Sequence, residues 1–154
     1  MHSRKITLQS SMEEIIAKCL YCTMAMVDQN NQPYVLPMNF GYADGVVYLH
    51  SAPEGKKVNI LRNNNSVCLS FSADLELRHQ HEEVACSYGM KYRSVLVYGK
   101  VEFIEDPEEK RSILNILMKQ YTGRDDYKYN DPAIINVLVY KVVAERMEGR
   151  AYGY

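Results

Sequence analysis

The sequence lacks tryptophan, has only three phenylalanines and has no apolar run long enough to cross a membrane. A membrane-spanning helix needs about 20 consecutive apolar residues. The first five residues are largely polar and basic and do not form the apolar core of a signal peptide. We therefore expect a cytoplasmic protein without a membrane partner. Its 154 residues fit one domain, residues 1–154, that is large enough to bury a core.

An excess of positive charge is also lacking. The formal net charge is −1 and the pI is near 6.4. Proteins that bind nucleic acid generally need a strongly basic face, so we expect no nucleic-acid partner. Tyrosine, in contrast, occurs 13 times. A tyrosine ring can be covered while its hydroxyl stays in water, which suits half-buried strands and subunit interfaces.

Several familiar catalytic and metal-binding patterns are absent. There is no GxGxxG sequence for a tightly held dinucleotide, and no Ser-His-Asp or paired-carboxylate pattern. Cys19 and Cys22 form a Cys-x-x-Cys pair, but no second pair follows at the spacing of a zinc ribbon. We expect these cysteines to be reduced, packed thiols, and we predict no metal site.

A polar loop raises one alternative. His79, His81 and Cys86 carry groups that can ligate zinc or haem iron. They stand among acidic residues, which favours a solvated loop. We expect residues 75–90 to form this loop or a broken strand.

Short alternating segments separated by turn residues dominate the sequence. The expected strands cover residues 23–27, 34–40, 46–50, 66–73, 94–105 and 134–143. Pro33 and Pro37 place the second strand at a sheet edge or beside a bulge, and Gly99 indicates a bend or bulge in the fifth. Most neighbouring strands are joined by turns such as Asp44-Gly45, which predicts an antiparallel sheet. The tail to residue 154 is expected to be extended.

Three helices are expected beside the sheet. A capping box within residues 10–14 opens the first, and the second covers residues 55–62. Asp106 and Pro107 open the third, and Gly123 ends it. Because about six antiparallel strands have edges to hide, the pattern favours a closed or nearly closed barrel.

Lys56 and Lys57 fall in the first turn of the expected second helix. The N-terminal end of a helix already behaves like about +0.5 charge, so two lysines there are unfavourable unless an anion is present. Backbone N–H groups and lysines together form a natural phosphate site. A solvated pair of surface lysines is the alternative.

Four blocks of residues follow one another within about residues 8 to 145: Gln32-Pro33-Tyr34-x-x-Pro37-x-Asn39-Phe40, Tyr48-x-His50-Ser51-Ala52-x-x-Gly55-Lys56-Lys57, Asn65-x-Val67-Cys68 and Tyr92-Arg93-Ser94-Val95-x-Val97-x-Gly99-Lys100-Val101-Glu102. With these blocks the sequence resembles the flavin-binding split β-barrel proteins related to pyridoxamine 5′-phosphate oxidase, in particular the nitroimidazole-resistance branch. The resemblance implies a mainly β fold, a six-stranded antiparallel split β-barrel of Greek-key topology with a few flanking helices.

The resemblance also implies a homodimer with FMN in two clefts between the subunits. FAD would fit as well if the phosphate end is open to solvent. The flavin ring would lie along the second strand, and the phosphate would be held after the third strand, with a serine nearby. The residues that the resemblance assigns to the cofactor are Met38, Asn39, Phe40, His50, Ser51, Lys56, Lys57 and Ser94.

We therefore expect an FMN-binding oxidoreductase that passes electrons from a small donor such as NAD(P)H to a small acceptor, with nitro-aromatic compounds among the candidates. His50 is the candidate catalytic residue, and a purely structural histidine is the alternative. Asn39 could likewise simply end a strand. Two other functions stay open, a non-catalytic flavin- or haem-binding module and a metal-binding barrel that uses residues 79–86.

Overall fold

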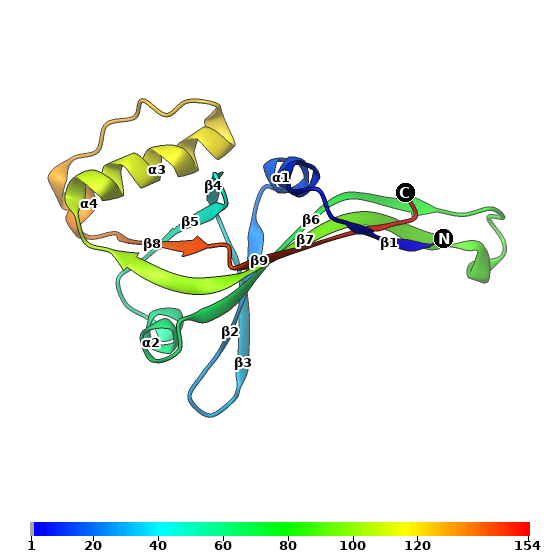
Figure 1. The fold of residues 1–154 in the computed structure, drawn as a ribbon, viewed down its shortest axis with the longest axis horizontal. Coiled ribbons are helices and arrows are strands. Elements are labelled where there is room, and N and C mark those ends of the chain that lie inside the picture. Colours follow the sequence, from blue (N-terminus) through cyan, green and yellow to red (C-terminus); the bar gives the residue numbers. More distant parts are fainter. Residues whose placement is uncertain (1) are drawn as a thin grey trace.

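The computed structural model describes residues 2–154 and is mainly β (Figure 1). The strands are β1 (Ser3–Ile6), β2 (Cys22–Val27), β3 (Pro33–Met38), β4 (Gly41–Ala43), β5 (Val46–Ser51), β6 (Ser66–Arg78), β7 (Gly89–Ile104), β8 (Leu138–Val143) and β9 (Arg146–Tyr152). The α-helices are α1 (Gln9–Ala17), α2 (Lys56–Asn63), α3 (Pro107–Thr122) and α4 (Asp131–Ile135). None of these helices is both long enough and apolar enough to cross a membrane.

The strands form one antiparallel sheet that is open at its ends. Its order is β3-β2-β6-β7-β8-β5-β4, and β9 pairs with both β7 and β1. The antiparallel split barrel is therefore confirmed, whereas the sheet path does not close on itself. Pro33 and Pro37 lie on β3, which is an edge strand as predicted.

β7 connects the two halves of the sheet. It pairs with β9 from Tyr92 to Tyr98 and with β8 from Val101 to Ile104. Gly99 lies at this change of partner, where an added Cβ would stand 2.5 Å from the carbonyl oxygen of Val143. We predicted a bend or a bulge at Gly99; the pairing with β6 continues unbroken through it, so no bulge is present there. The glycine instead permits two backbones to approach closely.

The ends of α3 lie where the sequence predicts them, whereas the start of α1 does not. The Asp106 carboxylate accepts a hydrogen bond from the Glu109 N–H at 2.8 Å, and Gly123 ends α3 with a φ of 75°. The predicted capping box of α1 is wrong, because that helix begins at Gln9, before the box, and Leu8 offers no capping side chain. Instead, α1 buries an apolar stripe that includes Ile15 and Ile16.

Two further elements differ from the expectation: β1 was not predicted, and residues 131–135 form α4 where the last strand was expected to start. The tail is extended, as predicted, and forms the strand β9. Residues 75–90 form a broken strand, one of the two predicted alternatives, because β6 continues to Arg78 and β7 starts at Gly89. These extensions form a two-stranded arm that projects from the body (Figure 1). A short 3-10 helix, Ala85–Ser87, lies in the loop that joins them.

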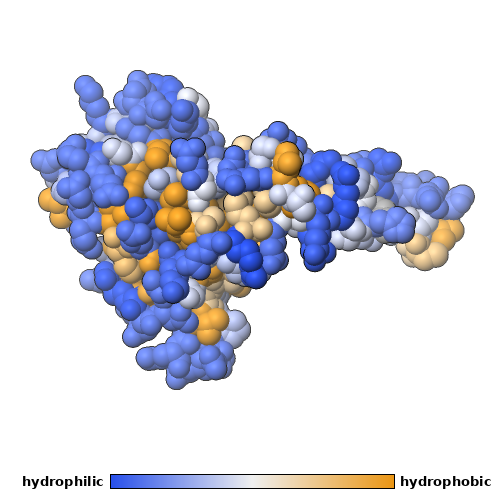
Figure 2. Space-filling view, viewed as in Figure 1, coloured by the Kyte–Doolittle hydropathy of each residue, from blue (hydrophilic) through white to orange (hydrophobic). Residues whose placement is uncertain are grey.

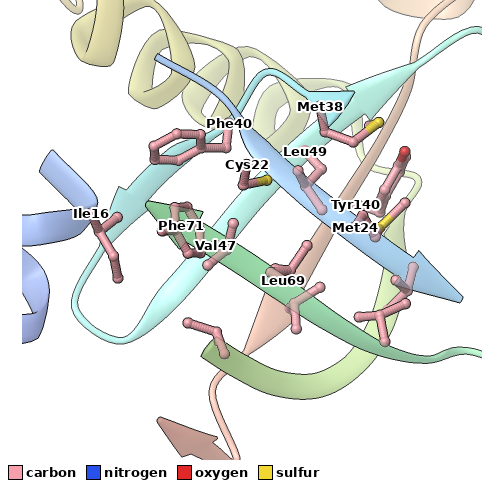
Figure 3. Close-up of a cluster of buried hydrophobic side chains, with 14 of the residues drawn as sticks. Ile16, Cys22, Met24, Met38, Phe40, Val47, Leu49, Leu69, Phe71 and Tyr140 are labelled. Atoms are coloured by element: carbon pink, nitrogen blue, oxygen red, sulfur yellow. The ribbon is translucent and has the colours of Figure 1, made fainter. Parts of the chain in front are cut away.

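The main core fills the space enclosed by the curved sheet, α1 and α2. Figure 3 shows part of it, with Ile16, Cys22, Met24, Met38, Phe40, Val47, Leu49, Leu69, Phe71 and Tyr140 labelled. Cys19 and Cys22 are both buried, as expected for packed thiols, and burial raises the pKa of Cys22 to about 12. A smaller cluster under α3 contains Ile104, Ile113, Leu117 and Val139.

The close approach at Gly99 predicts that Gly99→Ala destabilises the protein. The new methyl group would overlap Val143 O and the Val142 side chain, 2.8 Å away, so either β7 or β8 must shift. We expect the free energy of unfolding in urea to fall by about 1–3 kcal/mol. Lys100→Ala, at the exposed neighbouring position, is the control and should change it little. Equal urea midpoints for both variants would contradict this account of β7.

Candidate functional site

The chain passes from β5 into α2 through an exposed turn. Along β5, Val47 and Leu49 point into the core, so the alternation of a strand directs His50 to the other side. Residues 52–56 are exposed. Gly55 has a φ of 128°, a conformation that side chains with a Cβ rarely adopt, and it fixes the direction in which α2 begins. We refer to residues 50–57 as the cationic turn.

The N-terminus of α2 offers free hydrogen-bond donors. No side chain caps it, and its first turn contains no acidic residue. Asn59 is the first residue whose N–H bonds back, to the Gly55 carbonyl at 3.1 Å. The N–H groups of Lys56 and Lys57 precede it and have no partner within the helix. This end of α2 therefore suits an anion.

The two lysines connect the cationic turn to β3. Lys57 is half-buried, its Nζ lies 3.4 Å from Met38 Sδ, and burial lowers the pKa of its ammonium group. Lys56 is exposed, with its Nζ 4.6 Å from the centre of the Tyr34 ring. Across residues 2–154, neither ammonium group takes part in an ion pair. The positive charge at the turn is thus not neutralised by a carboxylate of the described chain.

Two buried polar atoms near this turn have no hydrogen-bond partner among the described residues, His50 Nδ1 and the Tyr140 hydroxyl. Burial, followed by the nearby Lys57 charge, lowers the pKa of His50, which keeps the imidazole neutral at pH 7. Burial raises the pKa of Tyr140 to about 12. The Ser51 hydroxyl donates to the Ala52 carbonyl at 2.9 Å. Unpartnered buried polar atoms are rare, and these two leave hydrogen-bonding capacity that a ligand could use.

The end of β3 runs beside the same turn and leads into β4. Met38 and Phe40 are buried, and Phe40 meets Phe71 edge-on with ring centres 4.9 Å apart. Asn39 lies between them and is exposed. Figure 3 shows Met38 and Tyr140 toward the same end of the core. Two of the predicted site residues, Met38 and Lys57, thus lie in contact.

Asn39 has a partner that the sequence did not indicate. Its amide nitrogen donates to the Tyr121 hydroxyl at 3.3 Å, and the Phe40 N–H donates to the same oxygen at 3.0 Å. Tyr121 lies in the last turn of α3, 82 residues further along the chain. No local sequence pattern marks this contact, because it depends on how α3 packs against the sheet.

Ser94 does not join the other predicted residues within one chain. It lies on β7, opposite Ser72 on β6 and Arg150 on β9. Val101, where β7 first meets β8, is seven residues further on, which corresponds to roughly 20 Å of strand. Ser94 alternates with the buried Val95 and therefore points to the outer face of the sheet.

The arm loop with His79, His81 and Cys86 is exposed, as the sequence predicted. The His79 ring stacks on Tyr88 with centres 4.7 Å apart. A shallow cavity of about 510 Å³ beside it is lined by Arg78, His79, Gln80, Cys86, Ser87, Tyr88, Lys91, Tyr152 and Gly153. Nowhere in residues 2–154 do three or more metal-ligating side chains (His, Cys, Asp or Glu) converge.

Comparison with known proteins agrees with this architecture. A crystal structure of a proposed 5-nitroimidazole antibiotic resistance protein from Bacteroides thetaiotaomicron is 45% identical, with a TM-score of 0.88 over 97% of this chain and 87% of that chain. An FAD-binding protein from Mesorhizobium loti is 21% identical, with a TM-score of 0.71 over 99% of this chain and 100% of that chain. The FAD and haem binding protein from Mycobacterium smegmatis is 16% identical, with a TM-score of 0.83 over 97% of this chain and 74% of that chain.

The last two similarities, at such low identity, concern the fold alone. No protein with curated function matches the sequence. A family model described as pyridoxamine 5′-phosphate oxidase matches residues 9–151, nearly the whole chain. The protein therefore belongs to the pyridoxamine 5′-phosphate oxidase family.

Proposed function

We propose that this protein binds a flavin at the cationic turn and acts as a flavin-dependent oxidoreductase. The observation that carries the proposal is the group of unpaired donors at that turn: the free end of α2, the half-buried Lys57 and the unpartnered His50. The dianionic phosphate of FMN accepts hydrogen bonds and neutralises lysines, so it fits this donor set. The family and the FAD-binding structural neighbours support the same ligand class.

Each residue of the turn has a separate role in this proposal. Lys57 supplies a charge that is already partly stripped of water, which strengthens its attraction to an anion. Lys56 and the Ser51 hydroxyl approach from more exposed positions. Because residues 52–56 are open to solvent, a phosphate held here would have its far side free. FMN is the proposed cofactor, and the second phosphate of FAD could extend outward from the same place.

The segment Met38–Phe40 would lie along the isoalloxazine ring, since Met38 directly contacts Lys57 at the cationic turn. When bound, the flavin supplies hydride and electron transfer, and the protein orients it and controls the surroundings of the ring. His50 is neutral at pH 7, and its unpartnered Nδ1 can hold or release a proton, so it is the candidate catalytic residue. The name of the Bacteroides relative points to a nitroimidazole or another small nitro-aromatic acceptor, with NAD(P)H as donor.

Haem binding on the arm is a second candidate. The cavity of about 510 Å³ presents the His79 imidazole, and Arg78 and Lys91 could pair with the propionates. The similar fold of the Mycobacterium smegmatis protein, named for FAD and haem, favours testing it. In that case the protein would be a carrier or sensor module.

We also propose that the protein is a homodimer. The outer face of the sheet, opposite the core, carries the side chains of Ala25, Val27, Val35, Pro37, Cys68, Ser94, Leu96 and Tyr98. α1 and α2 bury their apolar side chains on the core side, so they leave this face to another partner. Figure 2 shows further apolar residues at the tip of the arm. Extended apolar surfaces mark association sites, and in such a dimer we assign Ser94 to the cofactor of the second subunit.

The spectrum of the purified protein tests the proposed function. With FMN added and the excess removed, we expect an absorption band at about 450 nm that disappears when NAD(P)H is added under nitrogen and returns with a nitro-aromatic acceptor. A stable yellow protein that NAD(P)H never bleaches would support a non-catalytic module. No retained flavin, together with a strong Soret band after haemin is added, would favour the haem alternative.

Lys57→Met separates the role of the charge from that of the packing. Methionine keeps the apolar stem against Met38 but removes the ammonium group. We expect the dissociation constant for FMN, measured by fluorescence quenching, to rise about 10- to 100-fold, because a charge-assisted contact to the phosphate is lost. The matched variant Lys100→Met, at an exposed lysine elsewhere, should not change it. An unchanged affinity in Lys57→Met would rule out phosphate binding at this lysine.

The mass in solution tests the dimer. Light scattering after gel filtration should give twice the 17.8 kDa of the chain. Val35→Asp combined with Leu96→Asp places two charges on the outer face and should shift the protein toward the monomer. Ile135→Asp alters an equally apolar residue that is 73% exposed on α4, and should leave the mass unchanged. A wild-type monomer that still holds flavin would contradict the dimer.

A further inference from the structure

The Tyr121 hydroxyl holds the corner between β3 and β4. It accepts one hydrogen bond from the backbone of Phe40 and one from the side chain of Asn39, at 3.0 and 3.3 Å. Both donors belong to the segment that the proposed function places along the flavin ring. Tyr121 itself comes from α3, so the helix behind the sheet is connected directly to the cofactor-facing backbone.

The helix end that carries Tyr121 is itself well anchored. The neighbouring Gln120 side chain donates to the carbonyls of Ala17 and Cys19, both at 3.2 Å, which ties the same turn to the end of α1. On the other side, an added Cβ on Gly41 would lie 2.9 Å from the backbone of Ile116 and Leu117, so β4 rests directly on α3. The hydroxyl of Tyr121 is therefore held at a defined place relative to the β3–β4 corner.

The planarity of the peptide bond between Asn39 and Phe40 fixes the direction of the Asn39 carbonyl group. In a trans peptide the N–H and C=O groups point in opposite directions. Because the Phe40 N–H points at Tyr121, the Asn39 carbonyl oxygen points away from α3. No hydrogen bond within residues 2–154 uses that oxygen. It is a free acceptor at an exposed residue, between the buried Met38 and Phe40.

We propose that Tyr121 is a positioning residue that aims the Asn39 carbonyl oxygen at the N3–H group of the bound flavin. The oxidised isoalloxazine ring has a single N–H donor, at N3, and otherwise presents acceptors on its pyrimidine edge. An outward carbonyl fixed by a rigid helix matches that donor and disfavours a rotated ring. This inference rests on the proposed function, because it needs the flavin ring beside Met38–Phe40.

Tyr121→Phe tests the inference with two ligands, FMN and FMN methylated at N3, which lacks the donor. Phenylalanine keeps the ring but removes the oxygen that holds the peptide. In the wild type we expect FMN to bind about tenfold tighter than the methylated form, measured by fluorescence quenching. In Tyr121→Phe, FMN should bind more weakly and this ratio should fall at least about threefold, because the carbonyl is no longer held.

Tyr129→Phe is the matched control, because the Tyr129 hydroxyl donates to Asn115 at 3.0 Å on the same helix but does not contact the corner. Its ratio should equal that of the wild type. Equal affinity of the wild type for both ligands, or an unchanged ratio in Tyr121→Phe, would overturn the role of Tyr121 while leaving flavin binding intact. A wild-type protein that binds neither ligand would instead refute the proposed function and this inference with it.

Discussion

The structure depends on one long strand that serves both halves of the sheet. β7 pairs with β6, β9 and β8 in turn, and it can do so because Gly99 lets its backbone pass against Val143. β8 in turn aligns β5, and β5 leads directly into the cationic turn and α2. The position of the candidate site thus depends on a close backbone contact at Gly99, where a larger residue would force β7 or β8 to shift.

A second constraint acts at the cationic turn. Polar and charged groups there lack the hydrogen-bond or ion-pair partners that such groups usually have in a folded chain. A helix with no cap, a half-buried ammonium group and two buried polar atoms without partners each lower stability. These groups lie around the end of β5 and the start of α2, with Tyr140 on the core side of the sheet and His50 on the opposite side. Such concentration at one place is what a binding site requires, because an incoming anion meets donors that need not first leave other partners.

Much of this arrangement is predictable from the sequence where local chemistry decides it. Asp106 and Gly123 define α3, two prolines identify the edge strand, and Lys56 with Lys57 mark the cationic turn. The sequence fails where distant packing decides. The serines near residue 10 resemble a cap but lie inside α1, which is positioned by its buried stripe. β1 and β9 have weak patterns and exist because they pair with each other and with β7. Tyr121 appears as an ordinary helical residue, and only the packing of α3 against β4 brings it to Asn39.

The pairing of β1 with β9 sets Ser3 opposite Tyr152, so the two ends of the described chain lie side by side on the arm (Figure 1). A short peptide could therefore join them without disturbing the sheet, and new ends could be opened at an exposed turn such as Asn30-Asn31. Circularly permuted forms should retain the same barrel, because the arrangement of the strands in space does not depend on which strand comes first along the chain.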